Sequence, residues 1–121
     1  MHINLEATDK HSIQAYSDNE IKVDSKIYQT NLIISSHEII TDWPIETIKQ
    51  LNEELLEPLL RFGPTIIIIG HKLQGQFAPI QIMQSLSKQR IGLESMSIGA
   101  ACRTYNVLLS EQRDVVLGVI M

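Results

Sequence analysis

Residues 65–69 have the sequence Thr-Ile-Ile-Ile-Ile (TIIII), and the architecture of the chain can be worked out from this run. All five residues are β-branched, which favours a strand over a helix. The run also lacks the polar alternation of a strand with one exposed face, which is typical of a central strand covered on both sides. We therefore predict that residues 65–69 lie in the middle of a sheet.

The chain after this strand alternates between helical and strand patterns. Residues 79–90 and 97–112 carry apolar side chains at helical spacing, whereas residues 92–96 (GLESM) and 114–121 (DVVLGVIM) have the pattern of strands. Such alternation predicts parallel strands joined by right-handed crossovers. We expect strands 65–69 and 92–96 to be direct neighbours.

The first third of the chain has apolar residues at alternate positions, which indicates short antiparallel strands with one exposed face. Turn residues such as Asp24-Ser25 separate these strands. The expected strands lie at Ile3 to Leu5, at Ile13 to Ala15, at Ile21 to Val23, around Ile27, at residues 31–35 and at residues 38–41.

Residues 43–62 show helical spacing of their apolar side chains. Pro58 lies inside this pattern and is expected to kink or divide the helix. Asn52 is a suitable cap for a second helix, with Leu51 and Leu56 as its hydrophobic staple. The pattern is compatible with one kinked helix and with two short ones.

Composition restricts the class of protein. The chain has 121 residues, of which 44% are hydrophobic, and this is enough for one domain over residues 1–121 with a buried core. The formal net charge is −4 and the basic residues are scattered, which argues against a nucleic-acid partner. The single cysteine and the spacing of the four histidines predict neither a disulfide nor a metal site, so we expect no metal and no cofactor.

The sequence predicts a soluble protein of the cytoplasm. Residues 1–12 lack the apolar stretch of a secretory signal, and the longest apolar run, residues 66–69, is far too short to cross a bilayer. A lone cysteine also fits a reducing compartment.

The segment 92–113, GLESMSIGAACRTYNVLLSEQR, carries a resemblance to a known family. It resembles the family of mitochondrial complex I assembly factor 3 and its bacterial and archaeal relatives, a conserved domain of unknown function. Trp43 and the apolar strand ending in Gly70 also match, whereas His71-Lys72 stands where the family often has Thr-Gly. The matching residues of the segment are Glu94, Met96, Ala101, Cys102, Arg103, Thr104, Tyr105, Asn106, Glu111 and Arg113.

The resemblance implies a three-layer α/β fold. Its mixed central sheet has about five strands, one of them antiparallel to the rest, with helices on both faces and a β-rich N-terminal portion. For function, the resemblance implies a non-catalytic assembly protein that acts through protein contacts. We therefore expect a protein partner related to a respiratory complex, and we expect a homodimer because exposed β-edges invite pairing.

A crevice at the carboxyl ends of strands 65–69 and 92–96 is the alternative functional site. Ligands collect at such ends in open α/β sheets, and a helix N-terminus there suits an anion. The site would take a small anion or a nucleotide, and its candidate residues are Gly70, His71, Lys72, Ser97 and Arg103. The structural interpretation is that Ser97 only caps a helix and that His71-Lys72 is a solvated loop, and we favour it because no phosphate-loop pattern is present.

The helix at residues 97–112 leaves two further interpretations open. Arg103 either binds a ligand or pairs with Glu94 on the preceding strand. Asn106 is expected to bond a neighbouring loop. Cys102 and Tyr105 fall on the buried face, so we interpret the thiol as a core group rather than a nucleophile.

Overall fold

The computed structural model describes residues 10–121, which form one large sheet, one small sheet and three α-helices. The strands are β1 (Ile13–Tyr16), β2 (Ile21–Val23), β3 (Lys26–Tyr28), β4 (Leu32–Ile34), β5 (Ile39–Thr41), β6 (Ile66–Gly70), β7 (Gly92–Met96) and β8 (Val115–Val119). The helices are α1 (Glu53–Leu60), α2 (Ile80–Lys88) and α3 (Ile98–Ser110), and a 3₁₀ turn lies at Ile48–Gln50. The strand expected at Ile3 to Leu5 lies outside the described residues.

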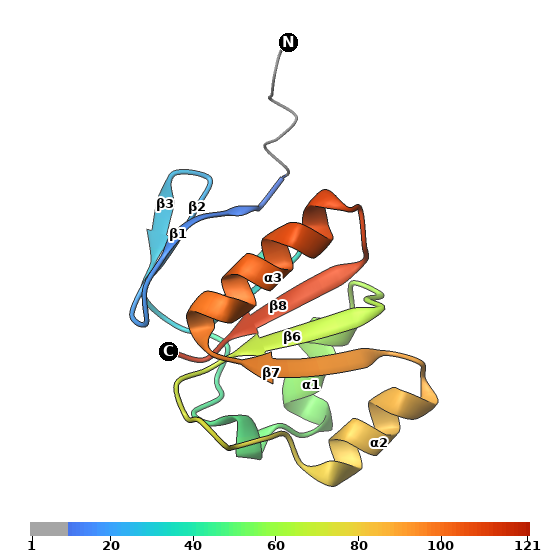
Figure 1. Ribbon diagram of the computed structural model, residues 1–121. Helices are drawn as coiled ribbons and strands as arrows, with labels where there is room; N and C mark the ends of the chain where they lie inside the picture. Colours follow the sequence, from blue (N-terminus) through green and yellow to red (C-terminus); the bar gives the residue numbers. More distant parts are fainter. Residues whose placement is uncertain (1–9) are drawn as a thin grey trace.

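The large sheet has the strand order β5-β4-β8-β6-β7, as Figure 1 shows for its later strands. Strand β6 pairs in parallel with both β7 and β8, while β4 pairs antiparallel with β5 and β8. One strand, β4, therefore runs against the other four. The predicted mixed five-stranded sheet is confirmed.

Helices cover both faces of this sheet because the side chains of β6 alternate between two cores. Ile68 packs in the core beneath α3, whereas Ile67 and Ile69 pack in the core beneath α1 and α2. All three side chains are fully buried. The prediction that residues 65–69 form a central strand covered on both sides is therefore confirmed, together with the three-layer arrangement.

Strands β6 and β7 are direct neighbours, as predicted from the alternation of elements. Their register pairs Ile66 with Gly92 and Gly70 with Met96, so the carboxyl ends of the two strands lie next to each other. The N–H of His71 donates to the carbonyl oxygen of Met96 at 3.0 Å and extends the ladder by one bond. The turns that leave the two strands thus start side by side.

Helix α1 begins at Asn52, whose Oδ1 accepts the N–H of Leu55 at 2.8 Å. The 3₁₀ turn ends just before it, so the alternative of two short elements is the correct one. Of the two expectations for Pro58, a kink or a division, the division is wrong, because α1 continues to Leu60. Pro58 removes only the bond to the carbonyl of Glu54, an exposed residue whose carbonyl can bond water instead.

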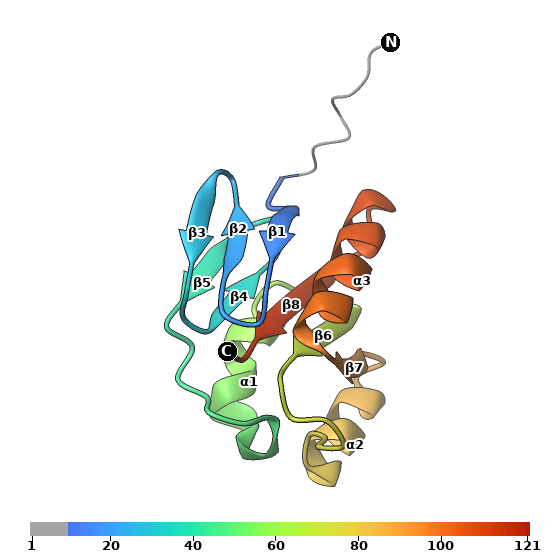
Figure 2. The ribbon, with the colours of Figure 1, turned by 60° about the vertical axis from the view of Figure 1, so that its left-hand side comes forward.

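The small sheet, with the order β1-β2-β3, lies beside α3 on the same face of the large sheet (Figure 2). Ile13, Ile21 and Val23 from its strands join the core beneath α3. Asp24 and Ser25 form the tight turn between β2 and β3, with φ angles of 52° and 66°. This sheet is the expected β-rich N-terminal portion.

Candidate functional site

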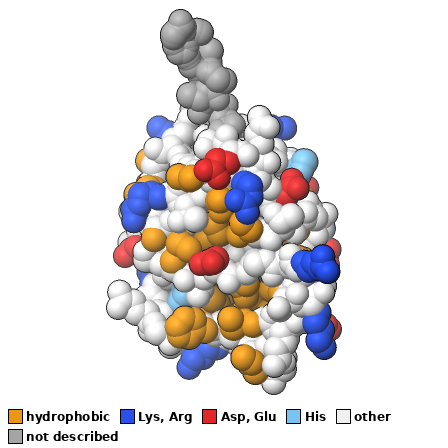
Figure 3. All heavy atoms as spheres, turned by 45° about the vertical axis from the view of Figure 1, so that its right-hand side comes forward, with side chains coloured by type: hydrophobic (Ala, Val, Ile, Leu, Met, Phe, Trp, Pro, Cys, Tyr) orange, Lys and Arg blue, Asp and Glu red, His pale blue; other side chains and the backbone are white. Residues whose placement is uncertain are grey.

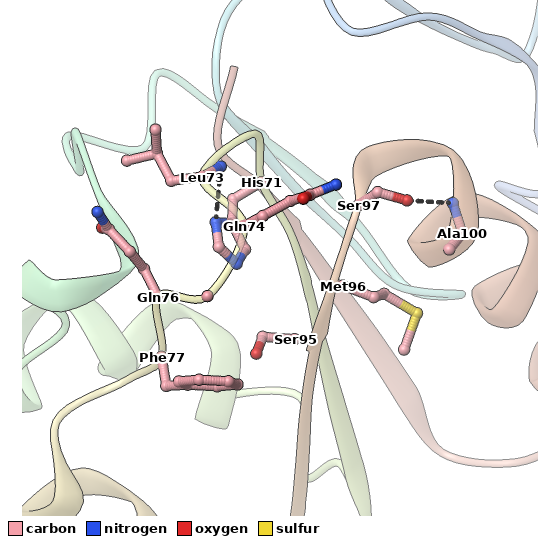
Figure 4. A pocket seen from close by; sticks show the side chains of 10 residues that line it. His71, Leu73, Gln74, Gln76, Phe77, Ser95, Met96, Ser97 and Ala100 are labelled. Carbon is pink, nitrogen blue, oxygen red and sulfur yellow. Dashed lines mark hydrogen bonds between the residues drawn. The ribbon is translucent and has the colours of Figure 1, made fainter.

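A pocket of about 350 Å³ opens where β6 and β7 end (Figure 4). Its walls are the loop at residues 71–77, the last two residues of β7 and the first turn of α3. Leu73 and Phe77 supply apolar surface on the loop side, and Met96 and Ala100 supply it on the opposite side. The pocket is therefore a mixed one, in which apolar side chains surround a few polar groups.

His71 is the buried polar residue of the pocket, with 8% of its surface exposed. Its Nδ1 accepts the N–H of Leu73 at 3.3 Å, so the neutral ring carries its proton on Nε2 (Figure 4). Burial lowers the pKa of His71, because a charged imidazolium loses its hydration there. The residue offers the pocket an N–H donor rather than a positive charge at neutral pH.

Ser97 also lines the pocket, at the start of α3. Its Oγ accepts the N–H of Ala100 at 3.3 Å, which makes it the N-cap of the helix. Gly70 lies underneath rather than in the pocket: a Cβ on it would stand 2.8 Å from the Cβ of Ala101. This glycine allows α3 to approach β6 closely.

The two candidate cationic side chains, Lys72 and Arg103, do not line this pocket. Lys72 is exposed and borders a separate pocket of about 140 Å³ with Glu46 and Met121. Arg103 donates from Nη1 to the Oη of Tyr16 at 2.7 Å, and its guanidinium carbon lies 5.8 Å from the centroid of that ring. The structure thus brings together His71 and Ser97 but does not bring Lys72 and Arg103 to them.

The polar side chains of α3 hold strand β1 instead. Asn106 bonds both backbone groups of Ile13: its Oδ1 accepts the N–H at 2.8 Å and its Nδ2 donates to the carbonyl at 2.9 Å. Tyr105 donates from Oη to the carbonyl of His11 at 3.1 Å. Much of the sequence motif in this helix therefore has a structural role, which is to fasten the small sheet.

Gly99 and Tyr16 belong to this attachment and were not singled out by sequence reasoning. A Cβ on Gly99 would lie 3.1 Å from the ring of Tyr16 and 3.3 Å from the Nη1 of Arg103, so the glycine makes room for their contact. A glycine inside a helix costs about 1 kcal/mol relative to alanine, and this was the one available signal of a close approach.

The remaining motif residues are divided between core and surface. Cys102 is fully buried, and burial raises the pKa of its thiol to about 12, so the thiol stays protonated and unreactive at neutral pH. Trp43 packs its ring against Gly118, and Thr104 donates from Oγ1 to the Sδ of Met96 at 3.5 Å. Besides Arg103, the motif residues that lie on the surface are Glu94, Glu111 and Arg113.

Glu94 does not pair with Arg103. The ion pairs in residues 10–121 join His11 to Asp24 and Arg61 to Glu57. In the same part of the chain, no group of three or more His, Cys, Asp or Glu side chains is placed to hold a metal ion. Glu94 is therefore an exposed carboxylate on β7 without a cationic partner among the described residues.

Residues 13–120 match the family described as "Protein of unknown function (DUF498/DUF598)". The chain belongs to this family. A related protein of Francisella tularensis subsp. holarctica (strain LVS), named 13 kDa major membrane protein, is 29% identical over 89 residues, which cover 73% of this chain and 72% of that protein. In the present DUF498/DUF598 protein, none of the helices in residues 10–121 has the length and apolar character to cross a membrane.

Solved structures of other proteins show the same fold. The Xanthomonas campestris protein XCC1710 is 31% identical, with a TM-score of 0.82 over 97% of this chain and 89% of its own. A Bordetella pertussis protein described as an Mth938-like domain is 20% identical, with a TM-score of 0.80 over 98% of this chain and 90% of its own. The fold of this family member is therefore Mth938-like.

Proposed function

We propose that this protein is a non-catalytic interaction protein of the assembly-factor type, as its resemblance to the family of complex I assembly factor 3 implies. One observation carries the proposal. Large apolar side chains are exposed together beside the pocket, with Phe77 62% and Ile80 61% exposed. Figure 3 shows hydrophobic side chains over the middle and the lower part of one face of the molecule. Contiguous exposed apolar surface of this kind is typical of protein-binding sites.

Leu73, Phe77, Ile80 and Met83 form this surface, which we call the apolar patch. Ile80 and Met83 are three residues apart on α2 and so share one side of the helix. Leu73 and Phe77 line the pocket, so the patch continues into it. A partner that covers the patch would also seat a side chain in the pocket.

The contacts that the motif side chains make within the fold support an interaction role. Asn106 and Arg103 are committed to contacts with β1, and Cys102 is buried as a protonated thiol. These residues are accounted for by the fold without any substrate. The apolar side chains exposed beside the pocket are better suited to binding a protein than to proton or group transfer.

The second candidate function is the binding of a small anion or a nucleotide in the pocket. The observation in its favour is that His71 and the N-terminal turn of α3 open onto the same space. The pocket offers an anion little positive charge, since His71 is neutral there and Lys72 lies outside the pocket. A thermal-shift screen of anions and nucleotides tests it: a rise in Tm that Ser97→Ala abolishes supports the second function, and a flat screen removes it.

The proposed partner is a membrane-associated protein, related to a respiratory complex, that this chain meets from the cytoplasm. The relative from Francisella is named a membrane protein, whereas the described part of this chain has no membrane-spanning helix. Attachment to the membrane through a protein partner would account for both the name of the relative and the helices of this chain. Cell fractionation tests this: the protein should leave the membrane fraction in high salt or urea, and extraction by detergent alone would contradict it.

Cross-linking and affinity purification from the native cell test the interaction itself. The native chain should recover one stoichiometric protein partner, and the double variant Phe77→Ser/Ile80→Ser should lose it. Val107→Ser is the matched control, because Val107 is 55% exposed but lies on α3 outside the patch. Equal recovery by all three chains, or recovery of no partner together with turnover of a metabolite, would contradict the proposal.

The proposal includes a homodimer that pairs the short edge strands β3 or β5. Light scattering of the purified protein measures it directly. A mass of twice the chain is expected, and a monomer at all concentrations would remove the dimer without affecting the apolar patch.

A further inference from the structure

We propose that β7 receives an extended segment of a partner protein as an added strand, with a basic residue of that segment beside Glu94 and an apolar side chain in the adjoining pocket. The inference rests on the proposed function, since it names the binding mode and the chemistry of the partner. It concerns the open edge of the large sheet, which the apolar patch adjoins.

The outer edge of β7 has unpaired backbone groups. Among residues 10–121, strand β7 is the last strand of the large sheet and pairs with β6 alone. The N–H of Gly92 donates to Thr65 at 2.9 Å and the carbonyl of Met96 accepts from His71 at 3.0 Å, so the backbone groups of residues 92, 94 and 96 point toward β6. Because these directions alternate along a strand, the N–H and C=O groups of Leu93 and Ser95 point outward.

This edge is the longest one that the described sheets leave open. Strand β7 has five residues. The other edge strand of the large sheet, β5, has three, and the edge strands of the small sheet, β1 and β3, have four and three. In the described part of the chain, no strand pairs with the outer side of β7, which is the last strand of the large sheet in Figure 1. A longer open edge can form more main-chain bonds with an added strand, so β7 is the best template for strand addition among the described strands.

Glu94 defines the charge of the added strand. It is exposed at the middle of β7 and has no cationic partner among the described residues. Opposite charges across neighbouring strands stabilise pairing, and like charges oppose it. If two copies of this chain paired their β7 strands antiparallel over all five residues, Glu94 would face Glu94. The occupant is therefore a different protein that places Lys or Arg there.

The pocket adds side-chain selectivity at the end of the strand. Ser95 and Met96, the last residues of β7, line it together with Leu73 and Phe77. A strand added along β7 passes this opening and inserts an apolar side chain into it, beside the N–H donor of His71. Main-chain bonds then supply affinity and the pocket supplies specificity, as in other cases of strand addition.

A library of short random peptides displayed on phage tests the inference against the purified chain. Ser95→Pro is the decisive variant, because the N–H it removes points away from β6 and proline is tolerated on an edge strand. Ser95→Ala is its matched control. Peptides selected on the native chain should bind Ser95→Pro at least about tenfold more weakly than Ser95→Ala, which loses the same side-chain hydroxyl but keeps the outward N–H.

Charge reversal gives a second test that does not depend on proline. Peptides selected by the native chain should alternate β-branched and polar residues and carry a basic residue, and Glu94→Lys should select an acidic residue at that position instead. The inference is overturned if no peptide is enriched, if enriched peptides bind Ser95→Pro as tightly as the native chain, or if Glu94→Lys selects the same sequences.

The cellular experiment separates this inference from the proposed function. If the Ser95→Pro chain recovers the native partner as well as the native chain does, the interaction function stands and strand addition fails. If no partner is recovered from cells but selected peptides bind at β7, strand addition stands and the assembly role fails. Recovery of the partner by Ser95→Ala that clearly exceeds recovery by Ser95→Pro supports both.

Discussion

Asn106 on α3 bonds both backbone polar groups of Ile13, a residue 93 positions earlier in the chain, at 2.8 and 2.9 Å. The amide therefore takes the place of one more strand residue beside β1. Together with Arg103 and Tyr105, it fastens the β1 end of the small sheet to α3, so the stability of that sheet should depend on it.

Replacing Asn106 with Ala should lower the free energy of unfolding by about 2 kcal/mol, because both backbone groups of Ile13 lose their partner in a half-buried place. Urea denaturation measures the change. Hydrogen exchange should accelerate in β1 and β2 and stay slow in β6. Asn19→Ala, at an exposed turn, is the control and should change little.

Gly70→Ala should destabilise the protein by about 1 to 3 kcal/mol, because the new methyl group would lie 2.8 Å from the Cβ of Ala101. Gly92→Ala, whose Cβ would meet nothing nearer than 3.8 Å, should be nearly neutral. Adding Ala101→Gly to Gly70→Ala should restore part of the loss. If it restores nothing, contact with α3 is not the reason for Gly70.

The thiol of Cys102 should resist alkylation at pH 8 in the folded protein and react after denaturation. Burial raises its pKa from 9.0 to about 12, so the reactive thiolate is scarce in the native state. Mass spectrometry after iodoacetamide treatment measures the modification. Val107→Cys, which places a thiol on the exposed side of α3, should react rapidly at its new position.

The same shift predicts a loss of stability in alkaline solution. Above about pH 9 the unfolded chain releases the Cys102 proton while the folded chain retains it until about pH 12, so the free energy of unfolding falls as the pH rises through that window. The slope from this group is at most about 1.4 kcal/mol per pH unit. Cys102→Ala should flatten it. An unchanged slope in that variant would mean that other groups cause the alkaline loss.

His71 should produce the opposite trend in acid. Burial lowers its pKa from 6.5, so below pH 6.5 the unfolded chain binds a proton that the folded chain still excludes. Stability should therefore decline as the pH falls from 6.5 toward the folded pKa. NMR titration of the imidazole gives the folded pKa, and His71→Asn should reduce the acid dependence of urea unfolding. A folded pKa above 6.5 would contradict the prediction.

Features that depend on near neighbours in the chain were predictable. The β-branched run at residues 65–69 is the buried strand, Asn52 and Ser97 cap their helices, and Asp24-Ser25 is a turn. Each of these follows from backbone preferences and hydrogen bonds over a few residues. Pro58 is the exception, because its local cost is a single hydrogen bond and the packing of α1 outweighs it.

The partners of the site residues depend on distant parts of the chain. Arg103 and Tyr16 are 87 positions apart, and nothing near either residue indicates that they meet. His71 and Lys72 are adjacent, yet the pocket beside β7 takes only His71. Periodicity tells which face of a helix is buried, but packing between elements selects what that face touches. The α/β layers were therefore readable from short-range patterns, whereas the composition of the pocket and the open edge of β7 arose only when the chain folded.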